Sequence, residues 1–406
     1  MFPLSPEERS LLDAVQNAPD DDGPRLVYAD WFDDRGDPRG RFIRLQLALA
    51  RLSEYEPRRT MLFEEERQLL ARHESEWTIP LRGLASGIVF RRGFVDEVNV
   101  TARQFLARSE TVFESAPIRH LHLLDVGQNL SAVLASPLLS RLSGLSFYAQ
   151  YLCGVGRLVD AKTLSRLSHL YLGRNRLTDD DVRLLATAPL AESIEELDLH
   201  ENEITDIGAE RLAEKGTFPK LTKLDLSHTG VGPVWATTIA TAPHRPVLRS
   251  LSLAGNAAVG RSSADGVTLF RVNELNLSET GLTVLSLNRF LGAVDTPTVK
   301  VLRLVGNTLG DGGAETIATS SVFSELRELD LRRNEIGSTG LEFLTDSTTL
   351  NRLHHLDLTS NPIDPMGWAT LLTAKGLKSL RKLELPTAGI SSALREALDR
   401  KYNRIS

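Results

Sequence analysis

One pattern of hydrophobic and polar positions recurs down the C-terminal three quarters of the chain. Its clearest copy, at 326–336, reads L-x-x-L-x-L-x-x-N-x-I. Further copies begin at Leu167, Ile194, Leu221, Leu248, Val272, Val299, Leu353 and Leu380, and weaker ones at Ile118 and Leu142. The step between copies is 27 residues from Leu167 to Leu248 and again from Val272 to Leu380. A constant period of this length predicts a solenoid in which each repeat is one structural unit.

The L-x-L segment of each copy predicts a short strand. Its two leucines point to one side of the strand and the residue between them points to the other. The asparagine that follows lies where the chain leaves the strand, and its amide can donate to and accept from the backbone of that turn. We expect these side chains to stack along the array: Asn175, Asn202, Asn256, Asn307, Asn334 and Asn361. Thr229 and Thr280 keep a hydrogen-bonding group at the same position.

The second half of each repeat predicts a helix. The segment at 206–213 recurs at 311–318 and 338–344, with apolar residues at i, i+3 and i+4. A strand and a helix in every repeat bend the stack into a horseshoe, with parallel strands on the concave side and helices on the convex side. Over residues 118–390 the pattern resembles the ribonuclease-inhibitor type of leucine-rich repeat. This resemblance implies an α/β solenoid from a class that chiefly binds other proteins.

Residues 1–80 are predicted to form a small all-α helical domain ahead of the solenoid. Apolar positions and turn signals divide this segment into four short helices. The first helix begins at Ser5, with Pro6 at its first position and Glu8 placed to close a capping box. Tyr28 and Trp31 are at helical spacing, and we expect them to belong to the core of this domain.

Three short motifs make residues 20–46 distinctive. These are Tyr28-Ala-Asp-Trp31, Arg35-Gly-Asp-Pro-Arg-Gly40 and Ile43-Arg-Leu-Gln46. The segment resembles the repeat-companion domain, which is found at the N-terminus of bacterial proteins with leucine-rich or other repeats. The resemblance implies a bacterial repeat protein and assigns no chemistry. We expect Asp30 and Arg41 to hold helices together instead of binding a metal ion or phosphate.

The ends of the solenoid need covers, because an open end exposes leucines and a sheet edge. Residues 81–117 are predicted to form the N-terminal cap from one or two strands and a helix, and residues 391–406 a C-terminal capping helix. Two repeats, at 142–166 and 248–271, depart from the pattern. Such an irregularity is typical either of a contact site or of a tolerated deletion, and both interpretations stay open.

Composition places the chain among ordinary globular proteins, with 41% apolar and 25% charged residues. The formal net charge of −6 argues against nucleic acid as the main partner. No apolar run approaches the roughly 18 residues of a transmembrane helix, and the N-terminus lacks the pattern of a secretory signal. Cys153 is the single cysteine, which excludes an intramolecular disulfide and fits a cytoplasmic location.

The search for catalytic chemistry predicts neither an enzyme nor a cofactor. No phosphate-binding G-x-x-x-x-G-K-[ST] loop, G-x-S-x-G elbow or H-E-x-x-H helix occurs. Asp198, His200, Asp225 and His228 lie on neighbouring predicted strands about 5 Å apart, so metal ligation is geometrically feasible. Mixed polar residues on an exposed sheet need no metal ion, however, and we predict none.

The main hypothesis is a non-catalytic interaction module or scaffold that binds a protein partner on its concave face. Acidic residues recur at the central outward position, which favours a partner with a basic patch. The predicted partner-binding residues are Tyr148, Tyr171, Asp198, His200, Asp225, His228, Asn276, Arg303, Asp330, Arg333 and Asp357. One alternative is a regulator, either inhibitor or activator, of a partner enzyme such as a GTPase. A ubiquitin-ligase-type effector is disfavoured, because Cys153 inside the array does not supply a separate catalytic domain. The oligomeric state is left open.

Overall fold

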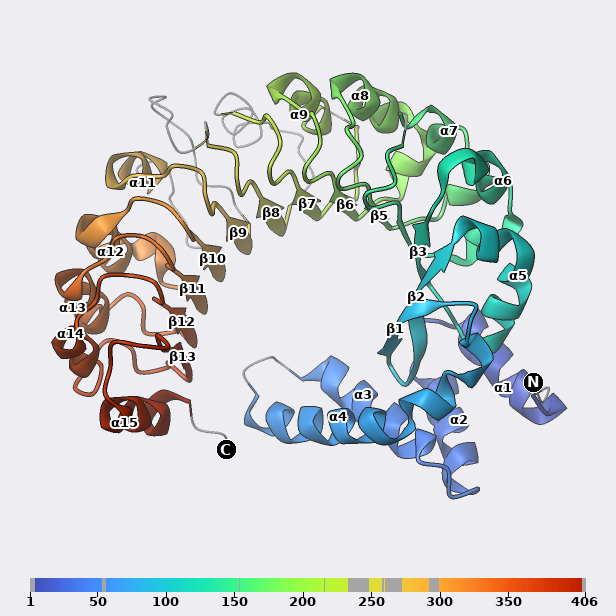
Figure 1. Ribbon diagram of the computed structural model, residues 1–406, viewed down its shortest axis with the longest axis horizontal. Helices are drawn as coiled ribbons and strands as arrows, with labels where there is room; N and C mark the ends of the chain where they lie inside the picture. The colour runs from blue at the N-terminus through green and yellow to red at the C-terminus, as the bar shows by residue number, and fades with distance from the viewer. Residues whose placement is uncertain are drawn as a thin grey trace. The chain divides into compact units, whose positions relative to one another are not determined.

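The computed structural model describes residues 4–52, 56–152, 154–214, 216–232, 248–257, 259, 272–291 and 299–403. These residues form two compact units, one from residues up to 150 with 160–171, the other from 151–159 with 172 onward. Both units combine a mostly parallel sheet with helices, and the chain begins with helices only, which confirms the predicted fold class (Figure 1). Our boundaries at residues 80, 117 and 390 remain predictions. Among the described residues, no helix is both long and apolar enough to span a membrane.

The first unit begins with four helices and continues into strands. Its elements are α1 (Pro6–Asn17), α2 (Gly23–Asp33), α3 (Arg39–Arg51), α4 (Pro57–Trp77), η1 (Ile79–Leu81), β1 (Ser86–Arg91), β2 (Phe94–Thr101), α5 (Ala102–Ser115), β3 (His120–Leu124), η2 (Gly127–Asn129), α6 (Leu130–Leu134), η3 (Pro137–Arg141), β4 (Gly144–Ser146), η4 (Lys162–Leu164) and β5 (His169–Tyr171). Strands β1 and β2 form an antiparallel hairpin, and β2 then pairs in parallel with β3. The predicted strands and helix between residues 87 and 116 are therefore present.

The N-terminal helices pack around the predicted aromatic residues. Tyr28 is 3% exposed and stacks on Phe32 at 4.6 Å between ring centroids, while Trp31 packs at the edge of the same core. Ser5 caps α1 by accepting a hydrogen bond from the Glu8 backbone N–H. The predicted capping box does not form, because the Glu8 carboxylate instead accepts a hydrogen bond from the Tyr28 hydroxyl at 3.1 Å. Burial of that hydroxyl requires a partner.

Two ion pairs of the companion-like segment hold helices together, as we expected of Asp30 and Arg41. Asp30 on α2 pairs with Arg44 on α3, and Arg41 on α3 pairs with Glu65 on α4. Residues 41 and 44 thus both project from α3 but reach different neighbouring helices.

Two motif residues of the N-terminal segment fasten the hairpin to α3. Gln46 accepts a hydrogen bond from the Gly93 backbone N–H at 2.6 Å. Gly93 has φ +92°, and a Cβ there would lie 2.4 Å from the Ile43 side chain. Only glycine fits this close left-handed turn, so the Ile43-to-Gln46 motif is explained by packing.

The second unit is built from strand–helix repeats. Its elements are α7 (Gly156–Val159), α8 (Asp179–Thr187), η5 (Pro189–Glu192), β6 (Glu196–Asp198), α9 (Asp206–Leu212), β7 (Lys223–Asp225), β8 (Ser250–Ser252), β9 (Glu274–Asn276), α11 (Val284–Leu291), β10 (Val301–Arg303), α12 (Gly310–Thr319), η7 (Ser321–Phe323), β11 (Glu328–Asp330), α13 (Ser338–Asp346), β12 (His355–Asp357), α14 (Pro365–Thr370), β13 (Lys382–Glu384) and α15 (Ser392–Tyr402). Within this unit the strands lie on one side of the repeats and the helices on the other (Figure 1). The predicted C-terminal helix is α15, capped by Ser391.

Strands β6 to β13 pair in parallel without a register slip, each with the next one along the chain. The middle residue of every strand is a leucine that is at most 2% exposed: Leu197, Leu224, Leu251, Leu275, Leu302, Leu329, Leu356 and Leu383. The residues on either side of each leucine point to the opposite face. One row of leucines thus forms the core, and the outward rows are aligned from repeat to repeat.

The asparagines form the predicted ladder. Asn202 donates to the carbonyl oxygens of Leu172 and Leu199 at 3.0 and 2.8 Å. Its Oδ1 accepts from the backbone N–H groups of Asn175 and Leu177, both at 2.9 Å. The arrangement recurs at Asn307, where Thr280 also takes part as predicted. This prediction is confirmed except at Asn334, whose Oδ1 has no hydrogen-bond partner among the described residues.

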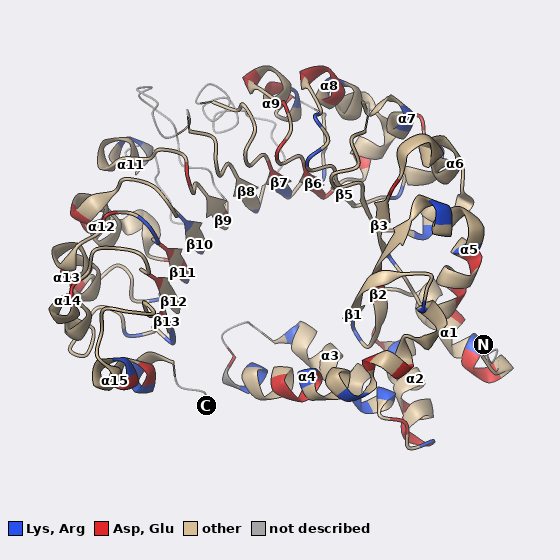
Figure 2. Ribbon diagram, in the orientation of Figure 1, with Lys and Arg blue, Asp and Glu red and all other residues tan. Residues whose placement is uncertain are grey.

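A second ladder runs along the helices. Asp179, in the acidic first turn of α8 (Figure 2), accepts hydrogen bonds from the Thr205 backbone N–H and hydroxyl at the start of α9. A Cβ added at Gly208 would lie 2.4 Å from the Asp179 carboxylate, and one at Gly340 would lie 2.5 Å from Asp311. In both pairs, an aspartate at the start of one helix lies against a glycine in the first turn of the helix in the next repeat, so these positions pack neighbouring repeats together.

Most of the irregular repeat at 248–271 lies outside the described residues, apart from 248–257 and 259. Cys153, in the irregular repeat at 142–166, also lies outside them.

A candidate interaction face on the repeat strands

The outward side of β6 to β13 carries a continuous row of polar side chains, which we call the ladder face. The row consists of the last residue of each strand: Asp198, Asp225, Ser252, Asn276, Arg303, Asp330, Asp357 and Glu384. All except Arg303, which is exposed, are half-buried, and they flank the fully buried leucines. The face is thus partly open to solvent and differs in chemistry from one repeat to the next.

Acidic residues recur in this row for a structural reason. The side-chain oxygen of the Asp or Asn accepts a hydrogen bond from the backbone N–H two residues later. Such a contact stabilises the turn by which the chain leaves the strand. Arg303 cannot accept this bond, and the Val305 N–H donates instead to the hydroxyl of Ser278 in the preceding repeat. The recurrence of Asp is therefore no evidence by itself for a basic partner.

Two predicted site residues, His228 and Arg333, lie off the ladder face. Their φ angles are 53° and 56°, which places them in the left-handed turn beyond the strand. The outward positions alternate, so Ser227 and Arg332 are the residues that follow Asp225 and Asp330 on the face. Strict counting by two from the strand would have found both residues.

The acidic residues near the C-terminal end of the ladder face are matched by cations. Arg332 makes a two-pronged contact with Asp330, at 2.9 Å from Nε to Oδ1 and 2.6 Å from Nη2 to Oδ2, and its Nε lies 3.3 Å from Asp357. Lys382 lies 2.9 Å from Glu384. The hydrogen bonds to Asp330 raise the pKa of Arg332 above its ordinary value. Charge is largely balanced in this region.

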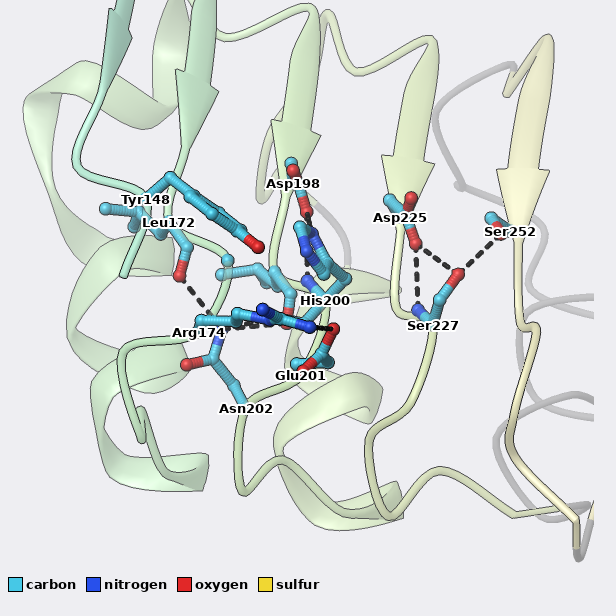
Figure 3. A network of polar contacts seen from close by, with 12 residues as sticks. Tyr148, Leu172, Arg174, Asp198, His200, Glu201, Asn202, Asp225, Ser227 and Ser252 are labelled. Carbon is cyan, nitrogen blue, oxygen red and sulfur yellow. Dashed lines mark hydrogen bonds and ion pairs between the residues drawn. The ribbon is translucent and has the colours of Figure 1, made fainter. Parts of the chain in front are cut away.

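The equivalent aspartates at the other end of the unit have a histidine between them. Nδ1 of His200 lies 2.6 Å from Asp198 Oδ1, and ligand atoms of Asp198, His200 and Asp225 all lie within 4.8 Å of one another (Figure 3). The hydrogen bond to Asp198 raises the pKa of His200 above its ordinary value. Burial, with repulsion from Asp198, raises the pKa of Asp225. His228 does not join this group, although the sequence placed it there.

Neighbouring residues hold this cluster in place. Asp225 Oδ1 accepts from the Ser227 backbone N–H at 2.8 Å and lies 2.5 Å from the Ser227 hydroxyl, which in turn lies 2.6 Å from the Ser252 hydroxyl (Figure 3). A Cβ added at Gly173 would lie 2.3 Å from the His200 ring, so this glycine makes room for the imidazole.

The two predicted tyrosines belong to the first unit. Tyr148, just after β4, is 40% exposed. Tyr171 ends β5, and its ring stacks on His122 at 6.4 Å between centroids. His122 and His120 are themselves hydrogen-bonded to Glu97 and Asp96 of β2, both at 2.8 Å. His120 and His122 therefore join β3 to β2.

Comparison with known proteins agrees with the repeat geometry. The family model described as "Leucine Rich repeat" matches residues 191–213, 297–318 and 325–344. The chain contains leucine-rich repeats. Each matched segment lies within the second unit. No curated protein matches the chain.

Solved structures that are similar to this chain have low sequence identity to it. The Rad7 and Elc1 complex from yeast is 13% identical, with a TM-score of 0.48, covering 96% of this chain and 95% of that one. An internalin from Listeria monocytogenes is 14% identical (TM-score 0.41; 75% and 84% covered). Human 5T4 trophoblast glycoprotein is 19% identical (TM-score 0.33; 50% and 78% covered).

Proposed function

We propose that the chain is a non-catalytic interaction module and that its ladder face binds a protein partner. The observation that carries this proposal is the aligned outward row over the second unit, half-buried or exposed at every strand. Constant leucines build the core beneath it, while the outward residues vary. Such a surface has the mixed polarity of protein interfaces, and it provides an arginine of the kind often found at hot spots.

The charge distribution on the ladder face indicates where a partner with a basic patch would bind. Arg332 and Lys382 offset the aspartates and glutamate near β11 to β13. Asp198 and Asp225 have only His200 within reach as a counter-charge among the described residues. A basic patch on the partner therefore fits best against β6 and β7, with Arg303 contributing from the middle of the face.

Finer features of the proposal rest on the sequence. We infer that the repeats are of the ribonuclease-inhibitor type and that residues 1–80 are a repeat-companion domain of a bacterial, cytoplasmic protein. The strand–helix alternation supports the repeat type, and the four helices before β1 support a separate N-terminal domain. In the first unit, the exposed Tyr148 is the candidate for a further contact.

Affinity capture with three full-length baits tests the proposal. The baits are the wild type, the ladder-face variant Asp198→Ala/Asp225→Ala/Arg303→Ala, and a control variant on the helices, Ile207→Ala/Leu285→Ala/Met366→Ala. The control residues are large, apolar and exposed at 65–78%. We expect a protein that is captured by the wild type and the control and lost from the ladder-face variant. Equal capture by all three folded baits would refute binding at this face.

A further inference from the structure

We propose that Asp198, His200 and Asp225 form a binding site for a divalent transition-metal ion such as Zn²⁺. Each side chain offers one ligand atom, and the three atoms lie within 4.8 Å of one another. Two carboxylates and one imidazole form a mixed oxygen and nitrogen donor set that suits such ions. The site goes beyond the proposed partner binding and does not depend on it.

The three ligands come from rigid positions. Asp198 and Asp225 end the adjacent strands β6 and β7 and face each other in register. His200 lies two residues after Asp198, on the same face, and its backbone N–H donates to Asp198 Oδ1 at 2.9 Å. Strand pairing thus fixes the spacing of the carboxylates, and the turn fixes the imidazole beside them.

An outer layer of hydrogen bonds orients the ligands. The Ser227 backbone N–H and hydroxyl hold one oxygen of Asp225, and Ser252 lies against that hydroxyl. Gly173 leaves the space in which the His200 ring lies. Metal sites depend on such outer contacts, because they fix the direction in which each ligand points.

A second pair of aspartates in the same unit shows that this geometry calls for a cation. Asp330 and Asp357 also end adjacent strands in register, and the residue two positions after Asp330 is Arg332. Its guanidinium lies against both carboxylates, at 2.6 and 3.3 Å. At the position of Arg332, the first pair has His200. An imidazole is a common ligand for metal ions, and a bound metal ion would supply a positive charge beside the two carboxylates.

The distances suit a small ion. Ligands of one tetrahedral zinc ion lie roughly 3.3 Å apart. The most distant pair must therefore close by up to roughly 1.5 Å, which side-chain rotation of a half-exposed group provides. Three protein ligands leave at least one coordination position for water or for an incoming group.

Titration of the full-length, tag-free chain with Zn²⁺ tests the site, with the absorption spectrum of bound Co²⁺ as a second readout. The test variants are His200→Arg, which copies the Arg332 arrangement, and Asp225→Asn, which keeps the Ser227 contacts. The control is Asp330→Asn/Asp357→Asn, with the same change on the matched pair. Circular dichroism and thermal unfolding establish that each variant is folded.

We expect one equivalent of Zn²⁺ for the wild type and the control. Affinity should fall by at least about tenfold in both test variants, with loss of the Co²⁺ bands. A wild type that binds no Zn²⁺, or a folded His200→Arg protein that binds as tightly as the wild type, would overturn the proposal. Because no partner is needed, this outcome is independent of the capture experiment.

Discussion

Two clusters on the ladder face have the same backbone arrangement and differ in the residue two positions after the first aspartate. In Asp198–His200–Asp225, which we call the histidine cluster, and in Asp330–Arg332–Asp357, the arginine cluster, adjacent strands end in aspartates. In both, the second aspartate is held by a hydroxyl residue, Ser227 or Thr359. Arginine closes one cluster with a charge that no ordinary pH removes, whereas the other cluster has an imidazole, which is also a metal ligand.

In these repeats, the residues that stabilise the fold differ from the residues that set the local chemistry of the surface. The aspartates are needed for the turns wherever they occur, as their hydrogen bonds to the backbone show. The residue two positions later differs from repeat to repeat: His200, Ser227, Ser278, Arg332 and Thr359. That residue decides whether a pair of aspartates is internally neutralised or available to a ligand.

The largest effects are expected from the asparagines beneath the two clusters. Asn202→Ala removes the partner of two buried N–H groups and of the Leu199 carbonyl, which should cost roughly 2–4 kcal/mol. Asn334→Ala should cost less, because among the described residues Asn334 Oδ1 has no hydrogen bond to lose. Urea denaturation measures both, with the exposed Asn351→Ala as control. Equal costs for Asn202→Ala and Asn334→Ala would contradict this prediction.

One carboxylate in the first unit contacts both an arginine and a histidine. Asp96 in the first unit is 3% exposed and contacts Arg119 at 3.0 Å and His120 at 2.8 Å. Burial alone raises the pKa of Asp96, but the His120 hydrogen bond and the charge of Arg119 outweigh it, so the pKa lies below the ordinary 3.8. Its stabilising contribution is therefore present above pH 3.8 and is lost as the pH falls through the lowered pKa.

Asp96→Asn should accordingly destabilise the chain by about 1.5–3 kcal/mol at neutral pH. The difference from the wild type should shrink as the pH falls below about 4. Denaturation midpoints over a pH series provide the measurement. A difference that stays constant down to about pH 3 would rule out the assigned charge pairing.

A histidine placed in the arginine cluster should create a second metal site. Val305 occupies, beside Arg332, the position that Gly173 occupies beside His200, so space for the ring must be made as well. Arg332→His/Val305→Gly should raise the zinc stoichiometry from one to two. Arg332→His alone should bind its second ion more weakly. If the folded double variant still binds one equivalent of Zn²⁺, then zinc binding needs a feature of the histidine cluster that the arginine cluster lacks.

The smallest effect is expected from Gly173→Ala. Its Cβ would meet the His200 ring at 2.3 Å and displace it, while the backbone at Gly173 is not in the left-handed region. Zinc affinity should fall by roughly tenfold, with the unfolding midpoint nearly unchanged. Gly156→Ala, where a Cβ meets nothing within 4 Å, is the matched control. Unaltered zinc binding in Gly173→Ala would mean that the ring needs no room there.

The sequence alone was enough to determine the fold of the repeats. Leucine spacing specified one strand per repeat, and the asparagine after it specified the ladder, because both depend on local periodicity and on backbone groups that must be paired. The helical half and the C-terminal helix followed from apolar spacing and caps in the same way.

Only the folded chain shows which residues contact one another and which of them lie together on the ladder face. The sequence grouped His228 with Asp225 and Arg333 with Asp330, but a left-handed turn after each strand carries those residues away and leaves Ser227 and Arg332 on the face. The sequence also predicted that Glu8 closes a capping box, but Glu8 accepts a hydrogen bond from Tyr28 instead. Nothing in the sequence indicated that Gly173 makes room for His200. These outcomes depend on contacts between residues tens of positions apart, which local periodicity does not encode.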